Sequence, residues 1–264
     1  MRKAFTLIEL VVSIGILAMV LSFAGVIFRV SIDSHRTAIA NAEIMQKLRA
    51  ITDQLNADFK SIASSYGGYI GFNTDKYTID GVTTNINSDC IAFFTNGDYK
   101  STSQYGGKTI SGNAACVFYG PADPNSFSRL LKPQDKILLR RQTILTADAP
   151  EAGSDPRGEY YITTLTEWRI QPPFSNPRDW VKRPHIDPGN LKEQFVMYLA
   201  QGADNFTIQF AETDSSGKIG WSRHEDGTPG DIRTNALKFT FTLYDSRGVI
   251  RKGRTFTHIV YLGS

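Results

Sequence analysis

Residues 1–28 read MRKAFTLIELVVSIGILAMVLSFAGVIF, and this stretch decides the fold of the 264-residue chain. No side chain from Leu10 to Phe28 is charged, and this run of about 19 residues is long enough to cross a bilayer as an α-helix. Arg2 and Lys3 precede the run, and positive residues favour the cytoplasmic side of a membrane. We therefore predict one membrane-spanning segment, with the rest of the chain outside the cytoplasm.

One carboxylate, Glu9, lies inside the apolar stretch. A charged side chain in hydrocarbon costs roughly 3 kcal/mol near the bilayer centre and less near the interface, and such groups are usually paired. An alternative is an ordinary secretory signal peptide that is cut after Ala24, in the small-residue sequence Ser22-Phe23-Ala24. That alternative disagrees with Glu9 and with the helical pattern that continues beyond the apolar run.

Residues 29–63 read RVSIDSHRTAIANAEIMQKLRAITDQLNADFKSIA and contain no Pro or Gly. Apolar residues recur at helical spacings of three and four, at Ile44, Leu48, Ile51, Leu55, Phe59 and Ile62. The positions expected to face water are Arg49, Asp53, Asn56 and Lys60. The pattern predicts one continuous helix from about Phe5 to Ala63, about 90 Å long, which stops at residues 64–68. A membrane helix followed by a separate core helix is the alternative.

The rest of the chain has the pattern of short strands. The segment 237–244 alternates apolar and polar residues, 245–248 has the composition of a turn, and 254–262 completes a predicted hairpin. Further candidate strands are 89–95, 115–119, 137–145, 160–165 and 206–210. We therefore expect an α+β fold, in which the amphipathic half of the helix packs on an antiparallel β-sheet domain over residues 64–264.

Two more specific expectations follow from this architecture. Helix residues Leu48, Ile51, Leu55 and Phe59 should contact Phe239, Phe241 and the 254–262 strand. A chain that begins near Ser34 should then fold as a soluble monomer. Prolines mark residues 147–190 as a loop-rich insertion, in which Trp168 and Trp180 are candidate anchors.

The segment 3–10, KAFTLIEL, resembles the cleavage and methylation signature of type IV prepilins and type II secretion pseudopilins. The resemblance covers residues 2–28, and the helix length supports it to about residue 63. It departs from the family pattern at Ala4, where the family usually has Gly. The resemblance implies that a prepilin peptidase removes the leader 1–4, cuts between Ala4 and Phe5, and methylates the new amine of Phe5. It also implies that Glu9 attracts the N-terminal amine of a neighbouring subunit during filament assembly.

The resemblance implies a single-pass protein of the inner membrane with a periplasmic domain, which later enters a filament. Its partners would be membrane lipid, other pilin or pseudopilin subunits, the prepilin peptidase and the inner-membrane assembly platform. The large exported part favours a minor, J-like subunit, of a secretion pseudopilus or of a type IV pilus. The alternative is a membrane-anchored extracytoplasmic binding protein or hydrolase.

No sequence motif supports an enzyme, because the four histidines are scattered and no hydrolase, metalloprotease or phosphate-loop signature is present. The formal net charge is +3, and no dense basic cluster suggests nucleic-acid binding. Cys90 and Cys116 are candidates for a disulfide, and they lack the further ligands of a zinc site. Oxygen ligands for calcium could come from residues of a Gly-rich loop, although a solvated loop is the simpler interpretation: Asp214, His224, Glu225, Asp226 and Asp231.

Overall fold

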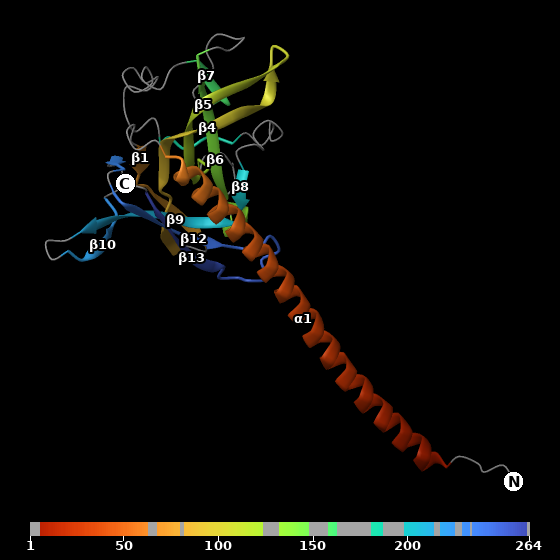
Figure 1. The fold of residues 1–264 in the computed structure, drawn as a ribbon. Coiled ribbons are helices and arrows are strands. Elements are labelled where there is room, and N and C mark those ends of the chain that lie inside the picture. The colour runs from red at the N-terminus through yellow and green to blue at the C-terminus, as the bar shows by residue number, and fades with distance from the viewer. Residues whose placement is uncertain are drawn as a thin grey trace.

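The structure, a computed structural model, describes most of the chain. The described residues are 6–62, 68–79, 82–123, 132–147, 158–162, 181–186, 198–213, 217–224, 229–232 and 234–262. The predicted anchors Trp168 and Trp180, residues 163–165 of one candidate strand and most of the predicted insertion lie outside these ranges. The molecule consists of a long helix that projects from a β-rich domain (Figure 1).

The helix α1 spans Leu7–Lys60 without interruption, which at 1.5 Å per residue is about 80 Å. The predicted single helix is confirmed, and the alternative of two separate helices is wrong. Its end lies three residues before the predicted end at Ala63. The chain leaves the helix there because strand residue Thr95 donates its hydroxyl to the carbonyl of Ser61 at 3.0 Å, and Ile62 pairs with Thr95 as an isolated bridge.

A seven-stranded sheet forms one layer of the domain. Its strands lie in the order β11-β1-β4-β5-β6-β7, and β8 pairs with β6 outside this order. Every pairing is antiparallel except that of β6 with β7. The 3-10 helix η3 (Pro133–Asp135) precedes β6. The strands are β1 (Gly68–Gly71), β4 (Cys90–Tyr105), β5 (Lys108–Pro121), β6 (Ile137–Thr146), β7 (Tyr160–Ile162), β8 (Tyr198–Gln201) and β11 (Pro229–Asp231).

A four-stranded antiparallel sheet forms a second layer, in the order β10-β9-β12-β13. The predicted C-terminal hairpin is confirmed, because β12 and β13 pair along their whole length and Phe241 lies opposite Phe256. A separate two-stranded ribbon pairs β2 with β3. The strands are β2 (Thr74–Ile79), β3 (Val82–Asn87), β9 (Ala203–Thr213), β10 (Ile219–Ser222), β12 (Ala236–Leu243) and β13 (Arg254–Tyr261).

One hydrophobic core joins the helix and both sheets. Its helix residues include Ile51, Leu55 and Phe59, which are fully or almost fully buried. Phe59 connects the layers, because its ring stacks on Phe93 of β4 at a centroid distance of 4.2 Å and lies 5.6 Å from Phe239 of β12. The expected antiparallel sheet is therefore two sheets, and the helix contacts residues of both.

The two cysteines are free thiols in the structure. In the β4–β5 register Cys116 lies opposite Phe94, four residues from Cys90 along the strand, or about 13 Å. A disulfide requires Cα atoms within about 7 Å, so the candidate pairing is not formed. The Cys90 thiol instead donates to the carbonyl of Val181 at 2.9 Å, and burial raises the pKa of this thiol to about 12.

Candidate assembly helix and its junction with the domain

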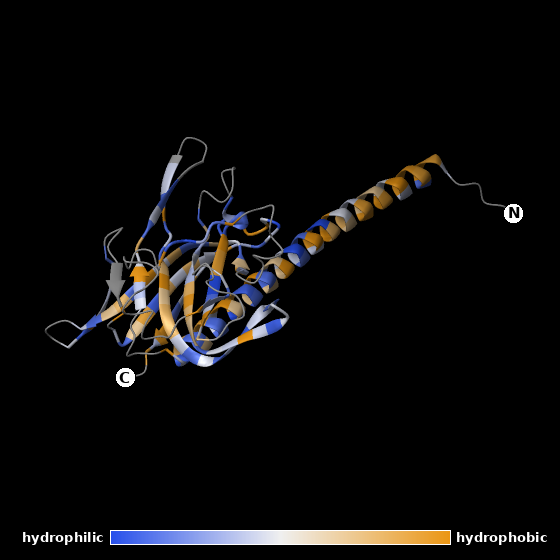
Figure 2. Ribbon diagram, turned by 90° about the horizontal axis from the view of Figure 1, so that it is seen from above, coloured by the Kyte–Doolittle hydropathy of each residue, from blue (hydrophilic) through white to orange (hydrophobic). Residues whose placement is uncertain are grey.

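The helix has two parts with opposite environments. We call residues 7–39 the free segment, in which no side chain is buried, and residues 40–60 the docked segment, which packs on the domain. Leu17 and Phe28 in the free segment are 58% and 69% exposed. Figure 2 shows that hydrophobic residues predominate in the first turns of α1 and give way to mixed polarity near the domain. Within the described residues, α1 is the one helix long and apolar enough to cross a membrane.

Glu9 lies in the first turn of this apolar helix and closes a capping box. The Thr6 hydroxyl accepts from the Glu9 N–H at 3.4 Å, and Glu9 Oε2 accepts from the backbone N–H of Thr6 at 3.0 Å and from its hydroxyl at 2.9 Å. The carboxylate therefore points toward the start of the helix, where the unpaired N–H groups favour negative charge. Ala4 and Phe5, the predicted processing residues, lie outside the described residues.

The docked segment buries one stripe of side chains. The predicted positions Ile44, Ile51, Leu55 and Phe59 are buried, while Leu48 and Ile62 are partly buried against the same core. The predicted wet positions Arg49, Asp53, Asn56 and Lys60 are exposed. Burial begins at Ala40, well after residue 29, the predicted start of the amphipathic half.

A buried ion pair that the sequence reading missed fixes the end of the helix to the seven-stranded sheet. Asp58 is 5% exposed and accepts from Arg140 of β6, with Nε at 2.6 Å and Nη2 at 2.8 Å. Its carboxylate also accepts from the Tyr119 hydroxyl of β5. Burial and the Asp58 charge raise the pKa of Tyr119, so this hydroxyl stays protonated and donates. The sequence position of Asp58 could have indicated its burial, because it falls three residues after Leu55 and seven after Ile51, on the same face of the helix.

The loop between β12 and β13 meets the helix where the helix leaves the domain. Lys47 donates to the carbonyl of Tyr244 at 2.8 Å, and Glu43 accepts from the backbone N–H of Ser246 at 2.9 Å. Asp245 in the same loop accepts from the N–H groups of Val249 at 2.9 Å and Ile250 at 2.8 Å. Burial opposes ionisation of Asp245, yet the N–H groups of Ile250 and Val249 hold its pKa below the ordinary value.

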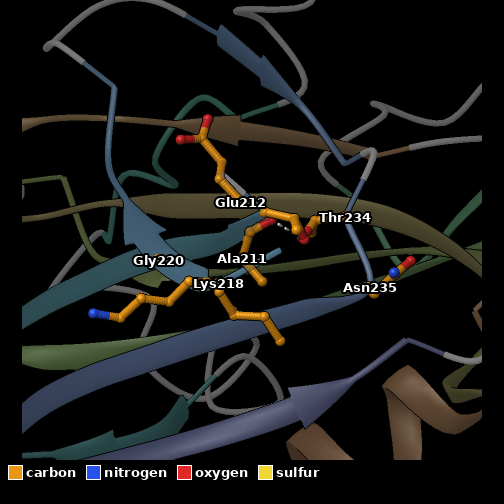
Figure 3. Close-up of a pocket in the computed structure, with 8 residues that line it drawn as sticks. Ala211, Glu212, Lys218, Gly220, Thr234 and Asn235 are labelled. Atoms are coloured by element: carbon orange, nitrogen blue, oxygen red, sulfur yellow. Dashed lines mark hydrogen bonds between the residues drawn. The ribbon is translucent and has the colours of Figure 1, made fainter. Parts of the chain in front are cut away.

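A pocket of about 740 Å³ lies beside the β9–β10 hairpin. Its lining offers Glu212 and Lys218 as charged groups, and Thr234 donates to the carbonyl of Ala211 at 2.8 Å (Figure 3). The eight described lining residues include no histidine or cysteine.

The residues suggested as calcium ligands are mostly outside the described part of the chain. Asp214, Glu225 and Asp226 lie outside it, and the side chain of Asp231 is not described. His224 is described, and its ring packs on Phe72 and Phe210 at centroid distances of 5.5 and 4.7 Å. Among the described residues no group of three or more His, Cys, Asp or Glu side chains could hold a metal ion.

Residues 1–25 match the family model of the prokaryotic N-terminal methylation motif. No curated protein and no solved structure matches the chain. The match confirms the resemblance that the KAFTLIEL segment carries, while the minor, J-like subtype stays a prediction. The chain therefore carries the prepilin and pseudopilin signal at the start of an apolar helix that is long enough to span a membrane, with a β-sheet domain behind it.

Proposed function

We propose that the chain is a minor, J-like structural subunit of a type II secretion pseudopilus or a type IV pilus. One observation carries the proposal: an apolar helix with a carboxylate in its first turn continues without a break into the core of the domain. A plain membrane anchor has no need of an acid at that depth, where an unpaired charge is unfavourable. A subunit that packs its helix against others can pair this acid and replace lipid contacts with protein contacts.

Processing supplies the cation for this pair. A prepilin peptidase cuts between Ala4 and Phe5 and methylates the new amine of Phe5, which keeps its positive charge after methylation. The Glu9 carboxylate already points toward the start of the helix, where it holds the N–H of Thr6, the residue after Phe5. In an assembled filament the Glu9 of one subunit pairs with the Phe5 amine of its neighbour, and both charges leave the lipid together.

The docked segment couples the membrane part to the exported domain. The buried stripe and the Asp58–Arg140 pair fix the helix to both sheets, so that a displacement of the helix during assembly carries the whole domain with it. Before assembly the protein is a single-pass protein of the inner membrane with its domain in the periplasm. Its partners are membrane lipid, the peptidase, the assembly platform and the other subunits.

Mass spectrometry of the protein isolated from native membranes tests the processing step. The mature chain should begin at Phe5 and carry one methyl group on its terminal amine. A chain that begins at Gly25 would show cleavage after Ala24 by a signal peptidase, and the filament proposal would be wrong. An intact, unprocessed chain in filament-forming cells would support the alternative of an anchored binding protein.

Substitution of Glu9 tests the pairing step. Glu9→Val should insert into membranes as well as the parent does, because loss of the charge favours lipid, but it should be absent from sheared filaments. Glu9→Gln is the matched control for shape, because its amide keeps an oxygen that can accept from Thr6 and only the charge is lost. Equal incorporation of both variants and the parent, measured by quantitative immunoblotting of filament fractions, would overturn the pairing with a neighbouring amine.

A further inference from the structure

A basic surface lies where α1 leaves the domain. It contains a small pocket of about 290 Å³ between the helix and the β12–β13 loop, where Ile39 and Val249 are partly exposed apolar residues beside Arg36 and Arg247. In Figure 1 the β12–β13 loop lies beside the helix at the point where the free segment begins. We call this surface, with the helix residues just before it, the exit face.

The cations of the exit face have no counter-ions in the described part of the chain. Six exposed basic residues make no ion pair and no side-chain hydrogen bond with any described residue: Arg29, Arg36, Arg247, Arg251, Lys252 and Arg254. The nearby acids are occupied, because Glu43 binds Lys47 at 2.8 Å and Asp245 holds loop N–H groups. Asp33 is the one acid between Phe28 and Glu43.

This surface accounts for the charge asymmetry of the molecule. The chain has 29 basic and 26 acidic residues, a formal net charge of +3. Without the six exit-face cations and the three acids beside them, Asp33, Glu43 and Asp245, 23 basic and 23 acidic residues remain, so the formal charges of the rest of the chain balance. The excess positive charge is therefore concentrated at the end of the domain that faces the apolar segment.

The distance to the membrane is short. Arg29 directly follows the apolar run, and Arg36 lies eight residues beyond Phe28, or about 12 Å along the helix. The polar head groups occupy about 5–8 Å on each side of the hydrocarbon, and electrostatic attraction extends about 8–10 Å further at physiological ionic strength. Long basic side chains also extend toward such a surface. The exit face is thus within electrostatic reach of the lipid head groups.

We propose that the exit face binds the anionic phospholipid head groups of the membrane that holds α1, so that the domain rests on the bilayer until the subunit is assembled. The phosphate groups bind Arg36, Arg247 and the neighbouring cations, and the apolar side chains of Ile39 and Val249 contact the glycerol carbons. The inference rests on the proposed membrane anchoring and does not depend on filament assembly.

The test uses the full chain in lipid nanodiscs at one copy per disc. Discs of phosphatidylcholine alone are compared with discs that contain 30% phosphatidylglycerol, and hydrogen–deuterium exchange is followed in peptides that cover residues 244–254. We expect several-fold slower exchange in the anionic discs, and loss of this protection in 0.5 M NaCl. A basic residue near an anionic surface strengthens binding about fivefold. The triple variant Arg247→Gln, Arg251→Gln and Lys252→Gln should therefore weaken the contact about a hundredfold and lose the protection.

The matched control removes two exposed cations from the far end of the β4–β5 hairpin, with Lys100→Gln and Lys108→Gln. This variant should keep the protection of residues 244–254. Unchanged exchange in peptides from β4 and β12 shows that each variant is folded.

Two results would overturn the inference. Equal exchange of residues 244–254 in neutral and anionic discs would show that head groups do not contact the exit face. If residues 244–254 are protected only in discs that hold two copies of the chain, and equally in neutral and anionic discs, this surface binds another subunit and not lipid. Either result leaves the mass of the processed chain and the Glu9 experiment unaffected, so this inference can fail while the proposed function stands.

Discussion

The two segments of α1 share one uninterrupted backbone and differ in what their side chains contact. In the free segment Leu17 is 58% exposed, whereas Leu55 in the docked segment is fully buried. In the free segment Glu9 is the one charged residue from Leu7 to Phe28, whereas the docked segment is apolar on one stripe and carries charged residues on its other sides. Both remain helical because each contains residues compatible with a helix and no proline.

The comparison shows that one continuous helix can have residue patterns suited to two environments, an apolar surrounding and the surface of a domain. A helix that is apolar all round suits a membrane or the interior of a bundle, whereas a helix with one apolar stripe suits the surface of a domain. The docked segment also contains Asp58, a buried carboxylate with two partners on the sheet. Glu9 in the free segment is exposed, and among the described residues its carboxylate bonds to Thr6 alone. The acid of the docked segment is bound by side chains of the domain, whereas the acid of the free segment is bound within its own first helical turn, and its pairing with a neighbouring subunit is our proposal.

The largest effect on the stability of the domain should come from truncating the same residue type in the two segments. Leu55→Ala should destabilise the domain by about 2–5 kcal/mol, because it leaves a cavity in the shared core. Leu17→Ala should leave domain stability unchanged, because its side chain contacts no part of the domain. Thermal unfolding of the full chain in detergent micelles, followed by tryptophan fluorescence, measures both. Equal effects would show that the docked segment is not the core helix of the domain.

The second comparison uses an acid from each segment. Asp58→Ala should destabilise the domain by about 3 kcal/mol, because it leaves the Arg140 guanidinium and the Tyr119 hydroxyl without their acceptor. The effect falls at the low end of the range for buried pairs, because the Arg140 side chain is 19% exposed and keeps some contact with water. Asp33→Ala in the free segment should change the stability by less than about 0.5 kcal/mol. Urea unfolding at pH 7 measures the difference. If Asp58→Ala leaves the free energy of unfolding unchanged, the ion pair does not hold the helix end.

The smallest effect should come from the loop that meets the docked segment, and it should depend on pH. Asp245→Asn should cost about 1–2 kcal/mol at pH 7, because charged acceptors form stronger hydrogen bonds than neutral ones. The folded-state pKa of Asp245 is lowered, so its stabilisation is present above the ordinary value near 4 and is lost as the pH falls through the lower folded pKa. Urea unfolding at pH 6 and pH 3 should show the difference between parent and variant shrinking. A difference that stays constant would contradict the role of the charge.

The parts of the domain that the sequence predicted are those in which burial is periodic. The helix stripe and the C-terminal hairpin were predicted because apolar residues recur at helical or strand spacing, and the expected contacts of Phe59 with the hairpin strand β12 are present. The candidate strands 89–95 and 115–119 cover only the inner parts of β4 and β5, which the structure extends and pairs as a hairpin. Their outer parts are mostly polar in sequence, and contacts with distant residues hold them. Tyr105 packs on Tyr160 at a centroid distance of 4.7 Å, and Glu159 accepts from the N–H groups of Thr102 and Ser103.

The sequence by itself determined the apolar segment that is long enough to span a membrane, the acid within it and the continuity of the helix. These properties depend on residue type and local spacing, and a helix forms its hydrogen bonds within one segment. Only the tertiary structure decided which sheets cover the docked segment, that Asp58 is bound by Tyr119 and Arg140, and that Cys90 and Cys116 lie too far apart to bond. These contacts join positions 61 and 82 residues apart, or depend on the register of two strands. No local pattern encodes that register, because it is set by the packing of the whole core.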